Sequence, residues 1–213
     1  MPDQWQAKWP LLAWLVIALA SSNTSAAQQP SGLPEHLMRN GAISIQEACD
    51  RVADLTTQSS PANIYPSASK CIELGNYSNA AKLPVLAAAF GRFDMLRVPD
   101  STSHQVVQIL QLHYMQNLSN DQRARVNFEI EKLTRKNSVE LDDFCDYMRR
   151  LGPPKYDPSY MEDHGMNAFV EERKISSPSN FEGEKAWNAL LVNELFCKPK
   201  NMSTHGSERM KPT

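Results

Sequence analysis

The sequence predicts an all-α protein, a non-repetitive bundle of about six to seven helices built around one helical hairpin and stapled by disulfide bonds. Apolar residues recur at helical spacing in one segment after another. No two alternating apolar runs are joined by a hairpin turn, so no β-sheet is expected. The chain also has four cysteines, an even number, after a leader-like start.

The composition indicates how large a core the chain can form and argues against a nucleic-acid partner. The 213 residues are 41% hydrophobic and 22% charged, with a net charge of −2. That is enough apolar material for one buried core, and the length is typical of a single domain. Lysines and arginines are scattered along the chain, whereas nucleic-acid binding needs a basic patch or stripe. We therefore expect no nucleic-acid partner.

The first 27 residues are predicted to be a secretory signal peptide. Residues 11–20 form an apolar segment, and Ser25 and Ala27 occupy the −3 and −1 positions of a cleavage site before Gln28. An uncleaved anchor is the alternative, but a membrane-spanning helix needs ~20 apolar residues. We expect a cleaved leader, a periplasmic protein and no stable membrane anchor after cleavage.

The polar segment that follows, residues 28–43, is predicted to be a linker, and the helical domain is expected to span residues 44–197. Ser44 and Glu47 match the capping-box pattern at the start of a first helix. The apolar face of that helix contains Cys49, which should therefore point toward the core.

The central part of the chain is predicted to form the hairpin. Residues 56–66 are expected to be a loop and residues 67–75 a short helix ending at glycine. A longer helix then runs over residues 76–90, where Pro84 is expected to kink it because proline cannot donate the helical hydrogen bond. The apolar residues within 93–98 follow no clear period, and this segment is assigned to a loop or a short helical turn.

Two further helices are predicted between residues 104 and 137. The first is capped within residues 99–103, and its apolar stripe consists of Val106, Ile109, Leu110, His113 and Tyr114. Ser119 and Gln122 form a second capping box. The charged helix that they open ends near Asn137, with its inward face formed by Val126, Ile130 and Leu133.

The last third of the domain is predicted to contain two main helices. One begins at Ser138 and is ended by the Gly-Pro-Pro sequence at residues 152–154. Residues 155–180 are expected to be irregular except for a short helix at residues 158–164. The final helix covers residues 184–196, and the stretch after it, residues 198–213, is predicted to be a disordered tail.

The four cysteines allow three pairings. We favour the sequence-local pairs Cys49–Cys71 and Cys145–Cys197, because each would staple neighbouring helices. Each bridge is expected to contribute ~3–4 kcal/mol in the loop-entropy model. Four free thiols are the alternative, which an oxidising compartment disfavours.

The segment Leu74–Ala81, LGNYSNAA, resembles the junction between the two helices of a tetratricopeptide or Sel1-like repeat. Those families place a glycine, then a tyrosine, then alanines where two antiparallel helices approach closely. The resemblance implies a tetratricopeptide-like hairpin at this point. No second copy follows about 34 residues away, so a repeat array is not expected.

An acidic cluster is one candidate site. Asp142, Asp143 and Asp146 share the helix side opposite the apolar stripe. The simplest interpretation is a solvated helix face. The functional alternative is a docking patch for a basic protein partner, whose charge would relieve the repulsion among these carboxylates.

His164 is the second candidate site residue. A histidine in the last turn of a helix is also favoured by the helix dipole, so a structural role competes with a chemical one. A hydrolase would use His164 together with Asp142 or Asp143. The sequence has no nucleophile elbow, zinc-ligand spacing or phosphate-binding glycine loop, and we expect no cofactor and no metal.

The overall layout is similar to that of the periplasmic immunity proteins of bacterial type VI secretion systems, which are small, exported and often helical. This resemblance implies a protein that binds and neutralises a toxic effector and is not an enzyme. Two alternatives remain open: a periplasmic hydrolase using His164 with a nearby carboxylate, and a structural component of an envelope complex. The sequence predicts no oligomeric state.

Overall fold

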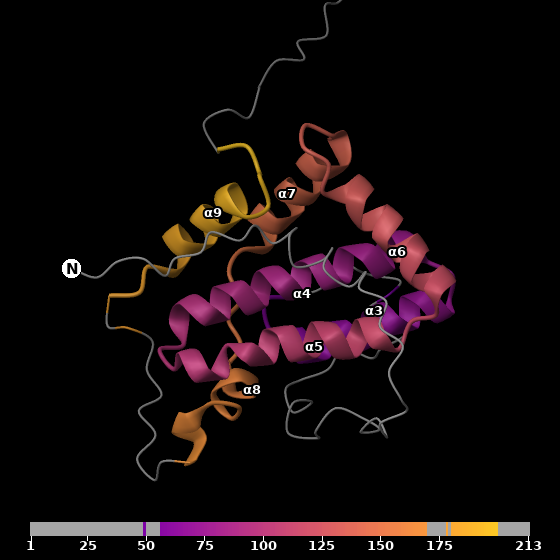
Figure 1. Cartoon of the computed structure of the whole chain (residues 1–213). Helices are drawn as coiled ribbons and strands as arrows, with labels where there is room; N and C mark the ends of the chain where they lie inside the picture. Colours follow the sequence, from indigo (N-terminus) through magenta and orange to yellow (C-terminus); the bar gives the residue numbers. More distant parts are fainter. Residues whose placement is uncertain (1–48, 50–55, 170–177, 179, 200–213) are drawn as a thin grey trace, which may run out of the picture.

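The computed structural model describes residues 49, 56–169, 178 and 180–199, and there every regular element is an α-helix or a 3₁₀-helix (Figure 1). The predicted all-α class is therefore confirmed. The predicted signal peptide, the linker, the first helix apart from Cys49, and residues 200–213 of the predicted tail lie outside the described residues. Among the described helices, none is both long enough and apolar enough to cross a membrane.

The predicted helical hairpin consists of α3 (Pro61–Glu73) and α4 (Tyr77–Arg97), which pack against each other. Gly75 turns the chain between them with a φ of +73°, a conformation that glycine adopts without steric cost. The side chain of Asn76 then caps α4 by accepting a hydrogen bond from the backbone N–H of Asn79, at 3.2 Å.

The start of α3 differs from the predicted loop at residues 56–66, which was wrong from Pro61 onward. Pro61 stands in the first turn of α3, where its missing N–H would have no helical partner anyway. Ile64 and Tyr65 are buried against the core. Burial of these side chains outweighs the turn-like composition, and α3 continues through Pro66.

The end of α4 also differs from the prediction, because α4 continues past Gly91 to Arg97. Gly91 is buried, and a Cβ atom there would lie 2.8 Å from Cγ1 of Val107 on the neighbouring helix. The glycine permits close packing and does not end the helix. The segment predicted as a loop or a short helical turn at residues 93–98 is helical to Arg97 and forms the end of α4, in which Phe93 is buried.

The remaining elements follow in the order η3 (Ser101–Ser103), α5 (Gln105–Gln116), α6 (Asn120–Leu133), α7 (Val139–Leu151), α8 (Ser159–Glu162), η4 (Met166–Phe169) and α9 (Gly183–Asn193). The capping box of Ser119 and Gln122 is formed in both directions. Ser138 caps α7, and Gly152 ends it with a φ of +79°. The stripe predicted for α5 is partly wrong, because Ile109 is 39% exposed.

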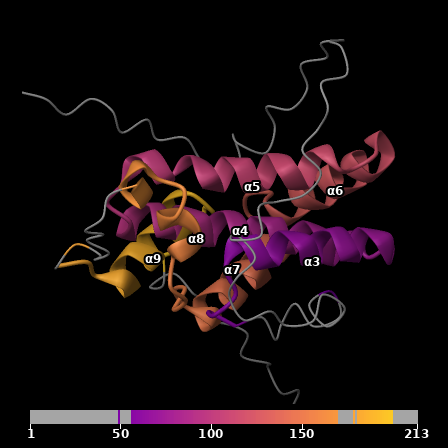
Figure 2. The same cartoon turned by 90° about the horizontal axis from the view of Figure 1, so that it is seen from below.

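Helix α4 is the centre of the bundle, in contact with α3, α5, α6 and α9. Figure 2 shows α5 on one side of α4 and α7 on the other. Most of α4 is buried, including the small residues Ala80, Ala81, Ala87 and Ala89, which allow neighbouring helices to pack closely. Both predicted disulfides, Cys49–Cys71 and Cys145–Cys197, are present with Cα–Cα distances of 5.1 and 5.6 Å.

Candidate functional site

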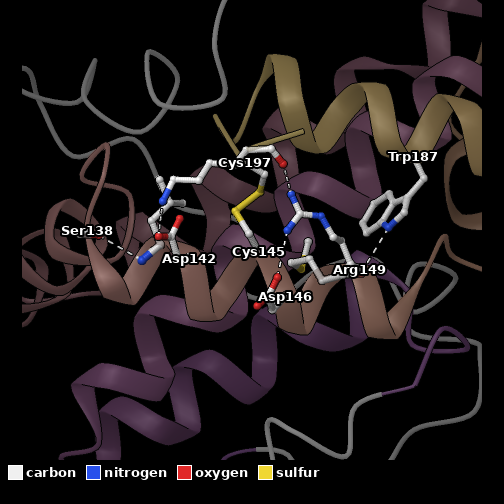
Figure 3. The surroundings of a disulfide bond; sticks show 10 residues. Ser138, Asp142, Cys145, Asp146, Arg149, Trp187 and Cys197 are labelled. Atoms are coloured by element: carbon white, nitrogen blue, oxygen red, sulfur yellow. Dashed lines mark hydrogen bonds and ion pairs between the residues drawn. A yellow bond between two sulfur atoms is a disulfide. The ribbon is translucent and has the colours of Figure 1, made fainter. Parts of the chain in front are cut away.

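The acidic face, interpreted as a solvated helix face or alternatively as a docking patch, lies on α7, and two of its three carboxylates contact the chain itself (Figure 3). Asp142 accepts a hydrogen bond from the ammonium group of Lys198, at 2.5 Å. Asp146 pairs with Arg149 at 3.0 Å, and Arg149 also donates to the backbone carbonyl of Lys198. Asp143 is exposed on the same helix.

The disulfide explains why Lys198 reaches this face. Cys145 points from α7 toward the C-terminal segment, and its bond to Cys197 brings the next residue over Asp142 (Figure 3). Lys198, where the predicted tail begins, is exposed, and its side chain contacts Asp142. The chain therefore already supplies a cation to the patch for which docking of a basic partner was the alternative interpretation. Exposed ion pairs of this kind contribute little to stability.

His164, the other predicted site residue, lies in the turn after α8, where its backbone N–H donates to the carbonyl of Met161 at 3.0 Å. Figure 1 shows α8 and α7 on opposite sides of the pair formed by α4 and α5. The structure therefore does not bring His164 together with Asp142 or Asp143. The carboxylate proposed as the partner of this histidine in a hydrolase is not beside it.

Asp100 is the acidic residue that holds the segment after His164. Its side chain caps η3 through Thr102 and accepts a hydrogen bond from the backbone N–H of Asn167, at 3.0 Å. The hydrogen bond from the Thr102 hydroxyl is the main reason why the pKa of Asp100 is lowered. Gly165 passes so close that a Cβ atom there would overlap the carboxylate. Asp100 is thus a structural anchor.

A buried polar cluster around Asp94 was not predicted from the sequence. Oδ2 of this fully buried carboxylate accepts hydrogen bonds from the hydroxyls of Tyr156 and Tyr160, at 2.6 and 2.8 Å. Its Oδ1 accepts one from Nε of Arg97, at 2.8 Å. Burial raises the pKa of Asp94 to about 6, although Arg97 and the two hydroxyls oppose the rise.

The enclosed position of this cluster assigns it a structural role. Arg97 also donates to the backbone carbonyl of Tyr156, at 2.9 Å, and its guanidinium lies over the rings of Phe93 and Tyr156. These contacts fasten residues 156–160 to the last turn of α4. In the sequence, Asp94 and Arg97 resemble an ordinary exposed ion pair three residues apart, so no pattern signals that the pair is buried.

An open groove lies where the first residue of α4 meets α6. It has a volume of about 390 Å³ and is lined by Tyr77, Ala124, Arg125, Phe128 and Glu129. Ala124 and Phe128 are one helical turn apart on α6, so the small alanine leaves open space beside the aromatic ring. The ring of Phe128 is 63% exposed, which is unusual for a large apolar side chain.

The charges around the groove are arranged in pairs. The guanidinium of Arg125 lies 5.5 Å from the ring centre of Tyr77 and forms an ion pair with Asp121 at 2.9 Å. Glu129 lies 3.8 Å from the ammonium group of Lys132. Tyrosine, phenylalanine and arginine are the residue types enriched in the centres of protein interfaces. The groove therefore combines aromatic and charged side chains on one surface.

Sequence analysis missed the groove because it depends on tertiary structure. The inward residues Val126, Ile130 and Leu133 were predicted correctly and are buried. The only sequence signal for the groove is an aromatic residue, Phe128, on the polar side of a charged helix. Among the described residues, no group of three or more histidine, cysteine, aspartate or glutamate side chains is placed to hold a metal ion.

Comparisons with protein-family models, with curated proteins and with solved structures found no match to this chain. The candidate site therefore rests on the geometry of the described residues.

Proposed function

We propose that this chain is an exported, disulfide-stabilised protein-binding protein that neutralises a secreted toxic effector in the bacterial periplasm. The observation that carries the proposal is the groove formed by Tyr77, Arg125 and Phe128. It combines a tyrosine and an arginine, two of the residue types that contribute most to the energy of protein interfaces, with a phenylalanine, a type enriched in interfaces.

The placement of the groove on regular structure adds to this argument. Its side chains project from two packed helices, α4 and α6, whose backbone needs little ordering when a partner binds. Both helices begin at a side-chain cap, Asn76 for α4 and Ser119 for α6. A binding surface on such elements is well suited to tight recognition of one protein.

The compartment is supported by the two disulfides. All four cysteines of the chain are paired, and such bonds persist mainly in oxidising environments outside the cytosol. The predicted leader fits the same interpretation. The periplasm, as the particular oxidising compartment, is part of the proposal.

The test is direct binding of the purified chain, without residues 1–27, to a toxin encoded by the neighbouring gene. We expect a 1:1 complex by calorimetry, and we expect cells that lack this chain to become sensitive to that toxin. If the two proteins do not bind and the deletion causes no sensitivity, the proposal is wrong. A cross-linked complex that contains envelope machinery and no toxin would favour the structural-component alternative.

A further inference from the structure

Helix α5 contains no aspartate, glutamate, lysine or arginine, although one of its faces is open to solvent. On that face Ile109 is 39% exposed and Leu112 is 53% exposed. The other exposed residues of the helix are Gln105, Gln108 and Gln116. The neighbouring helices α6 and α7 contain both acidic and basic residues, as surface helices usually do. Depletion of charged residues is instead a feature of the centre of a protein interface.

Four of these exposed residues lie on one line along α5. Gln105, Ile109, Leu112 and Gln116 are spaced by four, three and four positions, which places them on a single face of an α-helix. We call these four residues the α5 seam. It has two aliphatic side chains at its centre and one glutamine at each end of the helix. None of the four lines the groove, and Figure 2 shows α5 along an outer edge of the bundle.

The α5 seam matches itself when it is reversed. If two copies of α5 pack antiparallel about a two-fold axis midway along the helix, Gln105 of one copy faces Gln116 of the other. In the same arrangement Ile109 of one copy lies beside Leu112 of the other. A glutamine amide both donates and accepts hydrogen bonds, so the end pairs can bond to each other. A two-fold interface brings the same patch of both chains together and requires this kind of self-complementarity.

We propose that the α5 seam is a dimerisation surface at which two copies of this chain associate through antiparallel contact of their α5 helices. An uncharged seam has no charge complementarity toward a charged partner, and it meets a second copy without like-charge repulsion. This inference goes beyond the proposed function, since the seam and the groove share no residue. The apolar centre is small for a stable interface, so we expect a weak, reversible dimer with a dissociation constant on the order of 100 µM.

Sedimentation equilibrium of the chain without residues 1–27, from about 10 µM to about 1 mM, measures this association directly. Leu112→Lys places an ammonium group at the centre of the seam and should weaken dimerisation at least roughly tenfold. Val139→Lys makes a matched change at a 72% exposed aliphatic residue on α7, on the other side of α4, and should have no effect. Both positions are exposed, so both variants are expected to fold, as thermal melts verify.

Two double variants test the antiparallel pairing. Gln105→Glu combined with Gln116→Lys places a carboxylate of each copy opposite an ammonium group of the other, and this protein should dimerise at least as tightly as the wild type. Gln105→Glu combined with Gln116→Glu places carboxylates opposite each other and should weaken the dimer at least about fivefold at low salt. A parallel arrangement would set like charges against each other in both double variants, so both would be weakened.

Four results would overturn the inference. The first two are a monomer at the highest concentration and a dimer that Leu112→Lys does not weaken. The third is weakening of the dimer to the same extent by both double variants, which would exclude the antiparallel pairing. The fourth is a monomeric chain whose affinity for the toxin falls with Leu112→Lys, because the seam would then bind the toxin. Calorimetry of the wild type with the toxin tests the proposed function whether or not the chain dimerises.

Discussion

The hydroxyl of Tyr114 on α5 donates a hydrogen bond to the backbone carbonyl of Ala80 on α4, at 3.3 Å. In a regular helix this carbonyl would accept from the N–H of the residue four positions later. That residue is Pro84, which has no N–H. A side chain from the adjacent helix thus satisfies the group that the proline leaves without a partner, and α4 continues through Pro84 as one helix.

Replacing Tyr114 by phenylalanine should destabilise the fold by ~1–2 kcal/mol, because the buried Ala80 carbonyl then has no donor. In a Pro84→Ala background the Ala80 carbonyl regains a helical N–H donor. Tyr114→Phe should therefore lower the free energy of unfolding by less in that background. Urea unfolding of the four proteins in this double-mutant cycle measures the coupling. Equal costs in the two backgrounds would show that the hydroxyl does not compensate for the proline.

Replacing Gly91 by alanine should destabilise the protein by ~1–3 kcal/mol, because the added Cβ would lie 2.8 Å from Cγ1 of Val107. Valine is branched at Cβ and has few rotamers that avoid the contact. The Val107→Ala change should recover part of the loss when it is combined with Gly91→Ala. Thermal melts of the single and double variants measure this recovery of stability. A Gly91→Ala protein as stable as the wild type would contradict the close approach of α4 and α5.

The raised pKa of Asp94 predicts a pH dependence of stability. The ordinary value is 3.8 and the folded value is about 6, so the folded state binds more protons between these pH values. Stability from this group is therefore greatest below about pH 4 and is lost as the pH rises through 6, by up to ~3 kcal/mol. Urea midpoints from pH 4 to pH 7 should show this loss for the wild type relative to Asp94→Asn.

The Asp94→Asn variant serves as the reference because it has no titrating group at this position, whereas all other carboxylates are shared. The prediction is contradicted if the stability of the wild type relative to Asp94→Asn stays constant or increases as the pH rises. Either result would mean that Arg97 and the two tyrosine hydroxyls keep Asp94 ionised throughout.

Removal of the Cys145–Cys197 disulfide should lower the free energy of unfolding more than removal of the Cys49–Cys71 disulfide. Cys145 and Cys197 are 52 residues apart, whereas Cys49 and Cys71 are 22 apart. The loop-entropy model gives ~4 kcal/mol for the longer loop and ~3 kcal/mol for the shorter one. Guanidinium unfolding of the two paired Cys→Ala variants compares them. Four reactive thiols in the unreduced, denatured protein would contradict both bridges.

The elements predicted best are those whose ends have local chemical signals. Ser119 was identified as part of a capping box and Ser138 as the start of a helix, and both accept backbone hydrogen bonds as caps of their helices. The glycine at position 152 was predicted as a stop and has the left-handed conformation that ends α7. Such signals depend on residues a few positions apart, so the sequence contains all the information needed.

The elements predicted poorly depend on contacts between distant residues. Pro61 and Gly91 resemble breaks in the sequence, yet one begins a helix and the other lies inside one because of packing. Asp94 gives no sign of burial, since Tyr156 and Tyr160 approach it from more than 60 residues away. The groove at Phe128 likewise requires the placement of Tyr77, which only the folded chain defines.

The most direct test of the central claim is the affinity of the chain for its toxin partner when the groove is altered. We expect Phe128→Ala to weaken that affinity at least roughly tenfold, as truncation of a central aromatic contact does. Leu112→Ala, which removes an exposed apolar side chain from α5 outside the groove lining, is the matched control and should change it less than about twofold. Equal affinities of the wild type and Phe128→Ala, measured by calorimetry on folded proteins, would contradict the assignment of the groove as the binding site.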